Sequence, residues 1–477
     1  MVFLRKKIVF ILLFLLLPRW GVSGGESGFA TRLQTKHPAL PVRGDDAATK
    51  AVKLFGPRSP NGMLRLSLDE CIQRALTGNP ELKAADFSIN MAAAKIGEAD
   101  KIGYPLFEYE YNLAPVPKDV TNAVNSFFSG DITPFNRFKI GLGVPLNTFG
   151  KVKVGKQLVE AGVEAERGKK EVSKADIAYK VKQLYYGILL AREVSHLLNS
   201  AHEGVEGEVH KRETEGGGDP TELLKLKIFE ADLEKKIEEG DKKEILAREA
   251  LRVQAGIDPN VRFDLATDKL RPVSAKVGDY EQYRKEALDK RVELHLLELG
   301  YHAKEMQLTL EKRLMTPNVA VGGFFEIGRA SGVTGVTSTD DFTNPFNFTR
   351  AGLGLQIKGD LDIRKSLSKI HQDRSELYKI EVQKGYAESG VELEVKEAFL
   401  DLQKTKQDMD RAEEAGKLSR QLLFLTQSSF DIGLAESKDL IDALSSFLQT
   451  RGQYFEAVFY YNTAVAKLDQ KVGRVPE

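Results

Sequence analysis

Two aspartates near the C-terminus have the type and spacing that point most clearly to a chemical role. Asp439 and Asp442 lie three apart at the start of an expected helix, so their carboxylates share one helix face. Two carboxylates on one helix face concentrate negative charge there. A structural alternative stays open, because acidic residues in a first helical turn also favour the helix dipole. Glu222 stands at the equivalent place in an earlier helix.

Motifs for catalysis and metal binding are missing from the sequence. It contains no GxSxG, HExxH, P-loop or Rossmann fingerprint. His295 and His302 would share a helix face, but no carboxylate or cysteine is expected to complete a ligand set. The single cysteine, Cys71, sits among apolar residues and is expected to be small and buried rather than reactive. We therefore expect no enzyme, no cofactor and no metal site.

The composition limits the class of protein. The chain has 477 residues, of which 42% are hydrophobic and 29% charged, with 69 basic and 69 acidic side chains. This balance argues against a nucleic-acid partner, and the hydrophobic fraction is too high for a disordered chain. No apolar run reaches the roughly 18–20 residues of a transmembrane helix. A membrane role would therefore require β-strands or surface attachment.

The N-terminus has the pattern of a secretory signal peptide. Basic residues at Arg5–Lys7 precede the apolar run Ile8–Leu17, and small residues follow at Gly21–Gly24. The alternative, a membrane anchor, would need a longer apolar run to cross a core of about 30 Å. We expect residues 1–24 to be the signal peptide and residues 25–63 to be a flexible extension.

The rest of the chain repeats one plan. Ala75-Leu76 recurs as Ala287-Leu288, at an offset of roughly 210 residues, and the glycine-rich strand at 140–144 recurs at 351–355. Each unit has the order helix, strand, long loop, strand, long helix, turn and long helix. We predict two structural repeats, residues 64–270 and 271–473, followed by a short tail at 474–477.

Long helices dominate the prediction. They are expected at about 67–103, 150–213, 220–255, 279–315, 360–430 and 436–472. The fifth has no proline and would extend roughly 100 Å. In the last helix, apolar residues from Leu440 to Val472 follow alternating steps of four and three, interrupted only by Arg451. This heptad stripe predicts that the helices pair as coiled coils rather than cover an ordinary core.

Four segments alternate between apolar and polar residues, namely Phe107–Leu113, Phe138–Leu146, Val319–Ile327 and Ala351–Lys358. Such strands of about 8–11 residues can cross a bilayer, although a sandwich sheet with one wet face gives the same pattern. Long loops are expected at 116–135 and 329–347. Phenylalanines near the loop ends are candidates for an aromatic girdle: Phe127, Phe128, Phe135, Phe342, Phe346 and Phe348.

Membrane-spanning strands would require several copies of the chain. Four strands cannot close a barrel, and open sheet edges cannot exist in lipid. Three copies would supply twelve strands, an even number within the known range. Glycines on the polar face of the strands suit a crowded inner wall.

The order of these features resembles the TolC-like outer membrane efflux proteins over almost all of residues 64–473. The matching segments include Leu66–Glu70, Asn79–Leu82, Phe149-Gly150, Phe430–Leu434 and Asp439–Ala443. The resemblance implies a mixed α/β membrane protein, a homotrimer whose twelve-stranded β-barrel in the outer membrane continues into a long α-helical coiled-coil barrel in the periplasm.

The resemblance also implies the function and its partners. It implies a passive exit duct of a tripartite efflux or type I secretion system. A periplasmic adaptor (membrane fusion) protein would connect the duct to an inner-membrane pump of the RND, ABC or MFS type. The rival from another class is a soluble periplasmic coiled-coil adaptor or scaffold, against which the duplicated strand pair argues.

Residue roles follow from the same resemblance. Ile432, Gly433 and Leu434 match the helix-turn tip where adaptors dock, and Gly216 and Gly217 form the matching turn of the first repeat. That first turn lacks the Val and Leu that the family places beside the glycine.

The resemblance further implies a closed periplasmic entrance ringed by acids. Asp439 and Asp442 match the family's paired aspartates, and Glu222 would join them. The family latches this entrance partly through an arginine just after the tip glycine. Here that region is Leu434–Glu436, without arginine, so the latch must differ.

Overall fold

The computed structural model describes residues 63–101, 104–215, 220–359 and 362–474. The expected signal peptide, the extension up to residue 62, and Gly216 and Gly217 lie outside these residues. The helices are α2 (Leu68–Gly78), α3 (Pro80–Lys101), α4 (Ala123–Phe128), α5 (Lys151–Glu215), α6 (Pro220–Gln254), α7 (Tyr280–Lys290), α8 (Val292–Leu314), α9 (Ile363–Asp431) and α10 (Ser437–Val472). The strands are β1 (Leu64–Leu66), β2 (Leu106–Pro117), β3 (Ile132–Asn147), β4 (Phe263–Leu265), β5 (Asn318–Ala330) and β6 (Phe348–Lys358).

The helix predictions are confirmed within a few residues. The capping box at Ser67 starts α2, because Ser67 Oγ accepts from the backbone N–H of Glu70 while the Glu70 carboxylate accepts from that of Ser67. Asn79 ends α2, and Pro80 begins α3 at a position where no N–H donor is needed. In the part of the chain that the structure describes, no helix is long and apolar enough to cross a membrane.

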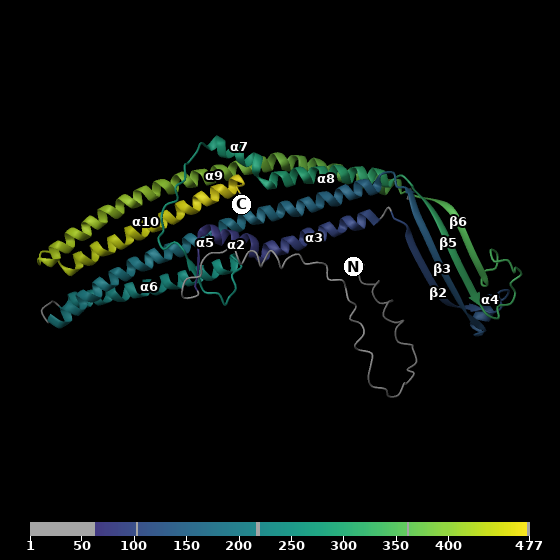
Figure 1. Cartoon of the computed structure of the whole chain (residues 1–477), viewed down its shortest axis with the longest axis horizontal. Helices are drawn as coiled ribbons and strands as arrows, with labels where there is room; N and C mark the ends of the chain where they lie inside the picture. Colours follow the sequence, from purple (N-terminus) through teal and green to yellow (C-terminus); the bar gives the residue numbers. More distant parts are fainter. Residues whose placement is uncertain (1–62, 102–103, 216–219, 360–361, 475–477) are drawn as a thin grey trace, which may run out of the picture. The chain divides into compact units, whose positions relative to one another are not determined.

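The long helices lie side by side in a layer (Figure 1). Next to the sheet, α3 contacts α5, α5 contacts α8, and α8 contacts α9. Farther along, α6 contacts α5, α5 contacts α10, and α10 contacts α9. Helices α5 and α9 run through both parts, and α9 with 69 residues extends about 100 Å. The turn at its far end is therefore remote from the sheet.

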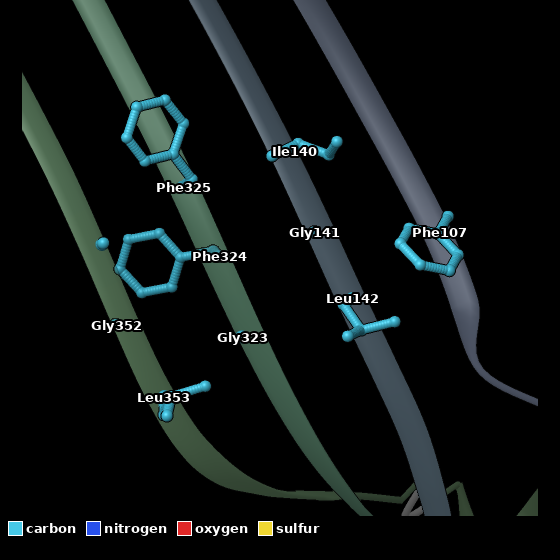
Figure 2. Close-up of a pocket in the computed structure, with 10 residues that line it drawn as sticks. Phe107, Ile140, Gly141, Leu142, Gly323, Phe324, Phe325, Gly352 and Leu353 are labelled. Carbon is cyan, nitrogen blue, oxygen red and sulfur yellow. The ribbon is translucent and has the colours of Figure 1, made fainter.

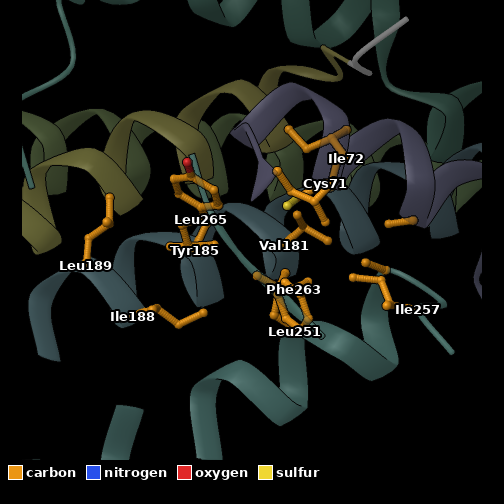
Figure 3. Packing of buried hydrophobic residues seen from close by; sticks show 14 of the residues in the cluster. Cys71, Ile72, Val181, Tyr185, Ile188, Leu189, Leu251, Ile257, Phe263 and Leu265 are labelled. Atoms are coloured by element: carbon orange, nitrogen blue, oxygen red, sulfur yellow. The ribbon is translucent and has the colours of Figure 1, made fainter. Parts of the chain in front are cut away.

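A hydrophobic core binds the middle of this layer together (Figure 3). It gathers Cys71 of α2, Val181 and Tyr185 of α5, and Leu251 of α6. The short strands β1 and β4, which the sequence analysis did not predict, pair in parallel and place Phe263 in this core. Cys71 is fully buried, as predicted. This core fixes α2 and the start of α3 against the long helices α5 and α6.

The predicted heptad stripe of α10 faces its neighbours. Val458, Tyr461 and Val472 are buried, the first in the core of Figure 3 and the others against α9. Arg451, the one interruption, places its guanidinium 4.8 Å from the centroid of the Tyr454 ring. Because a cation over an aromatic face is stabilised, the arginine fits the stripe without a buried unpaired charge.

Strands β2, β3, β5 and β6 form one sheet in that order, and every pairing is antiparallel. The strands are longer than predicted, with 12, 16, 13 and 11 residues. The expected loops are therefore shorter than 116–135 and 329–347, and the first contains α4. The added part of β2 contains Pro115 and Pro117, and β2 is an edge strand of this sheet, where proline is tolerated.

The pairing register brings the alternating residues of all four strands onto common faces. One side, the apolar face, carries Phe107, Tyr109, Tyr111, Leu113, Phe138, Ile140, Leu142, Val144, Val321, Phe325, Ile327, Ala351, Leu353, Leu355 and Ile357. The polar residues Asn136, Arg329 and Thr349 lie on the same side, at the end of the sheet farthest from the helices. The other side, the charged face, carries Glu108, Glu110, Arg137, Lys139, Glu326, Arg350 and Lys358 together with most of the sheet's glycines. The predicted alternation is confirmed and continues across the whole sheet.

The predicted aromatic girdle is wrong for three of its six members. By register, Phe135 and Phe348 lie on the charged face, and Phe346 packs against Phe135 there. Phe127 and Phe128 on α4 are exposed. The sequence could not separate the two groups, because the side on which a loop-end residue lies depends on how far each strand extends.

Candidate functional site

The turn between α9 and α10 places two apolar side chains in solvent. Helix α9 ends at Asp431, and Gly433 adopts a φ of 76°, a left-handed conformation that closes the helix through a hydrogen bond from the N–H of Leu434 to the carbonyl of Ser429. Ile432 and Leu434 on either side are 71% and 79% exposed. We call residues 432–436 the tip turn. Exposed apolar side chains around a tight turn are suited to contact another protein.

The predicted aspartates follow the tip turn on α10. Asp439 Oδ2 accepts a hydrogen bond of 3.1 Å from the backbone N–H of Glu436, so this carboxylate also caps the helix. Asp442 is exposed one turn further on. The helix-capping role that was weighed from the sequence is therefore observed for Asp439.

Glu222 lies in a cluster that joins the helix pair α5–α6 to the helix pair α9–α10. Its Oε2 accepts from Arg212 Nη1 at 2.6 Å and from Ser437 Oγ at 3.1 Å. Arg212 belongs to the last described turns of α5, and Ser437 is the fully buried first residue of α10. The hydrogen bond from Arg212, followed by that from Ser437, holds the pKa of Glu222 below its ordinary value. Glu222 is thus a paired carboxylate that connects α6 to α10.

Arg212 is a residue of this cluster that the sequence analysis missed. Besides Glu222, it donates to Glu208 at 2.9 Å, and its guanidinium lies 5.3 Å from the centroid of the Phe430 ring on α9. One side chain therefore touches α5, α6 and α9. Basic residues are common in the last turn of a helix, where they interact favourably with the helix dipole. The sequence therefore gave no reason to single out Arg212, apart from its position ten residues before Glu222.

The two histidines of α8 that the sequence analysis weighed lie on one helix and contact groups of that region. His302 contacts the carboxylates of Glu298 at 3.4 Å and Glu305 at 3.0 Å on its own helix. His295 Nε2 lies 3.0 Å from the carbonyl of Asp289. Among the described residues, no group of three or more His, Cys, Asp or Glu side chains is arranged to hold a metal ion.

The apolar face of the sheet is the second candidate surface. Leu353 on β6 and Tyr109 on β2 are 89% and 81% exposed, and the central strands expose Ile140, Leu142 and Phe325. Figure 2 shows side chains of this region on all four strands. An exposed apolar surface that extends over a whole sheet marks a contact with membrane or protein.

One glycine of the charged face, Gly352, is closely packed. A Cβ atom at Gly352 would lie 2.7 Å from a ring carbon of Phe324, whose ring lies against this glycine on the neighbouring strand (Figure 2). A side chain at position 352 would therefore displace the ring.

Both edges of the folded chain lack a partner within the described residues. Strands β2 and β6 are the edges of the sheet. The adjoining helix edges expose large apolar residues, with Phe87 on α3 at 70% and Val382 and Tyr386 on α9 at 74% and 82%. Unpaired strand edges and apolar helix faces both favour association with further chains.

Comparison with known proteins identifies the fold. No family model and no curated protein sequence matches the chain. Solved structures do match: the outer-membrane channel OprN has 15% identity and a TM-score of 0.69, covering 85% of this chain and 89% of that one. The Campylobacter jejuni CmeC outer membrane channel has 15% identity and a TM-score of 0.69, covering 86% of each chain. CusC, whose structures concern folding and transmembrane channel formation, has 14% identity and a TM-score of 0.68. The match covers 88% of this chain and 95% of that one. The chain therefore has the fold of TolC-like outer membrane channels.

Proposed function

We propose that this protein is an outer membrane channel-tunnel, a passive exit duct for substrates that an inner-membrane pump and a periplasmic adaptor deliver. The observation that carries the proposal is the sheet with one largely apolar and one charged face, whose apolar face is exposed on all four strands. In a transmembrane β-barrel, apolar residues face lipid and polar residues face the lumen. The apolar face would then contact outer membrane lipid, and the charged face would line the pore.

The direction of the edge strands supports closure by copies of the same chain. Successive strands alternate in direction, so β6 of one copy and β2 of the next would meet antiparallel, like every other pair in the sheet. Because open edges are not tolerated in lipid, pairing between copies satisfies the backbone groups of β2 and β6. The exposed edge helices α3, α6 and α9 would close the helical layer in the same step.

Three copies give the barrel of twelve strands that the resemblance implies, and the helical layer of each copy adds four helices to a periplasmic coiled-coil barrel. We also propose that residues 64–270 and 271–473 are duplicated repeats. Two observations support this: β2–β3 and β5–β6 are both antiparallel pairs, and each is followed by two long helices. Removal of residues 1–24 as a signal peptide fits export to the periplasm.

The periplasmic entrance is assigned to the tips of the long helices. In a trimer, Asp439 and Asp442 would place six carboxylates around the opening, which would favour cations. Glu222 would contribute less to this charge, because Arg212 neutralises it at 2.6 Å. The cluster of Arg212, Glu222, Phe430 and Ser437 replaces the missing arginine after the tip glycine and holds the two helix pairs of one chain together.

The tip turn is assigned to the adaptor. Ile432 and Leu434 present apolar side chains on either side of Gly433, where the backbone is open to close approach. Gly216 and Gly217 would form the second docking turn of each chain. The pump, of the RND, ABC or MFS type, would supply the energy, and no chemistry is assigned to this chain.

Planar bilayer recording on the purified protein tests the proposal. We expect insertion, a small conductance and cation selectivity, with light scattering in detergent giving the mass of a trimer. A protein that stays soluble without detergent and never inserts would instead support the alternative, a periplasmic coiled-coil adaptor or scaffold with a water-facing sheet.

A further inference from the structure

The charged face of the sheet is covered at one end, although the sheet is a single layer. Glu326 and Phe348 lie on this face and are 7% and 3% exposed. Phe325, the neighbour of Glu326 on the same strand but on the apolar face, remains 42% exposed. The difference shows that a segment of the chain lies over the charged face at the end of the sheet farthest from the helices.

The covering segment is the loop between β5 and β6, residues 331–347. Arg350, which lies on the charged face opposite Glu326, donates through Nε to the carbonyl of Asp341 at 2.5 Å and through Nη2 to the carbonyl of Asn344 at 2.6 Å. Its guanidinium also lies 3.9 Å from the centroid of the Phe348 ring. Because Arg350 points from the charged face, these hydrogen bonds hold the loop down over that face.

Aromatic rings provide a second anchor for the loop. The Phe346 ring packs edge-on against Phe135 with 5.7 Å between centroids, and Phe135 lies 6.4 Å from Phe348. Gly328 makes room for this cluster, because a Cβ there would lie 2.5 Å from a ring carbon of Phe348. Asn344 is 8% exposed and braces the loop from within through its Nδ2, which donates to the carbonyl of Ser338 at 3.0 Å.

The loop is also braced by the β2–β3 connection. The N–H of Val120 donates to the carbonyl of Thr334 at 3.1 Å, and the N–H of Thr334 donates to the carbonyl of Lys118 at 2.6 Å. Two connections far apart in the sequence thus form one cap at this end of the sheet. A loop anchored at Arg350, at the aromatic cluster and at Thr334 has a defined position.

We propose that residues 331–347 form a lid inside the pore, which limits the size of what passes the end of the barrel remote from the helices. The proposal rests on the proposed channel function, because only a closed barrel turns the charged face into a lumen. In a trimer, three such lids would narrow the mouth, independently of the tips of the helices. Arg350 and Phe346 are the residues that position each lid.

Accessibility of a cysteine beneath the lid tests this. Gly141→Cys places a thiol on the charged face of β3, where the nearest atom to a Cβ is 3.9 Å away. Leu142→Cys on the apolar face is the matched control. The native Cys71 does not compete, since it is fully buried and burial raises the pKa of its thiol to about 12. Intact cells are treated from outside with a small charged maleimide or with a maleimide on a polyethylene glycol chain.

We expect the small reagent to label Gly141→Cys and the polymer reagent to label it slowly. Arg350→Ala or Phe346→Ala should raise polymer labelling at least about tenfold, since charged hydrogen bonds or ring contacts of the lid are lost. Arg329→Ala is the control, because Arg329 binds the carbonyls of Gly328 and Phe348 at the strand ends rather than the loop. Phe346→Leu, which keeps an apolar contact, should lie between the two.

Three outcomes would overturn the lid. Polymer labelling as fast as small-reagent labelling in the otherwise unchanged chain would show an open mouth. Equal polymer labelling in Arg350→Ala and Arg329→Ala would show that Arg350 does not position the loop. No labelling of Gly141→Cys by the small reagent would refute the channel itself, and the lid with it. Because the first two outcomes refute the lid and leave the channel standing, the two failures can be told apart.

Discussion

Replacing Arg212 is the most informative perturbation of the helix tips. Arg212→Met keeps the aliphatic stem and the helix propensity but removes the guanidinium. The variant loses hydrogen bonds of 2.9 Å to Glu208 and 2.6 Å to Glu222, and the contact with the Phe430 ring at 5.3 Å. These contacts connect α5 to α6 and α9. We therefore expect the two helix pairs of each chain to separate more readily at the tips.

The magnitude can be worked from the burial of the pair. A hydrogen bond to a charged group contributes about 1.5–3 kcal/mol and a cation–π contact about 0.5–1 kcal/mol at exposed sites. The Arg212 and Glu222 side chains are 18% and 26% exposed, so water screens part of this. Glu222 also keeps its bond to Ser437. A net loss of about 2 kcal/mol for one chain corresponds to roughly a 30-fold shift of the equilibrium towards separated tips.

Single-channel recording in planar bilayers measures this shift as more frequent or longer high-conductance events. Arg167→Met on the same helix is the matched control, because the Arg167–Glu164 pair is 62% exposed on both sides and should contribute little. Melting curves of both variants check that the fold is intact. If Arg212→Met keeps the closed conductance of the unchanged protein while its melting temperature is also unchanged, the assignment of this cluster as the latch is refuted.

Other predictions concern charge, the tip turn, pH and the cysteine. Asp439→Asn with Asp442→Asn, which keeps the capping acceptor of Asp439, should lower cation selectivity; an unchanged reversal potential in a salt gradient would remove these residues from the entrance. Gly433→Ala should destabilise the protein by about 1 kcal/mol because its φ is 76°, whereas Gly162→Ala, with no atom within 4 Å in helix α5, should be neutral or stabilising in the same melting assay. Arg474, bidentate on Glu286, lowers the pKa of Glu286 from 4.5 to about 2; this carboxylate therefore stabilises the fold above pH 4.5, and the contribution is lost as the pH falls towards 2. Glu286→Gln should flatten that part of a stability curve measured against pH. Cys71 should react with a thiol reagent only after unfolding, because burial raises its pKa to about 12, and fast reaction of the native protein would contradict its place in the core.

Local periodicity explains why most elements were predictable. The spacing of apolar residues along α9 and α10 and the alternation in β2 and β3 depend on each segment alone, and the structure confirms these elements within a few residues, apart from the longer strands. The capping box at Ser67 and the break at Pro80 are also local signals. The pairing of β1 with β4 was missed, since three-residue strands carry no measurable period.

The sequence by itself determined the long helices, the alternating strands, the exposed tip turn at Gly433 and the acidic start of α10. These are set by backbone conformation and side-chain type over a few neighbouring residues. Only the tertiary structure decided that Arg212 reaches Glu222 and Phe430, and that Arg350 holds the β5–β6 loop on the charged face. Such contacts depend on the rotation of one helix against another and on strand register. A shift of one residue would turn these side chains away, and nothing in the local pattern fixes that choice.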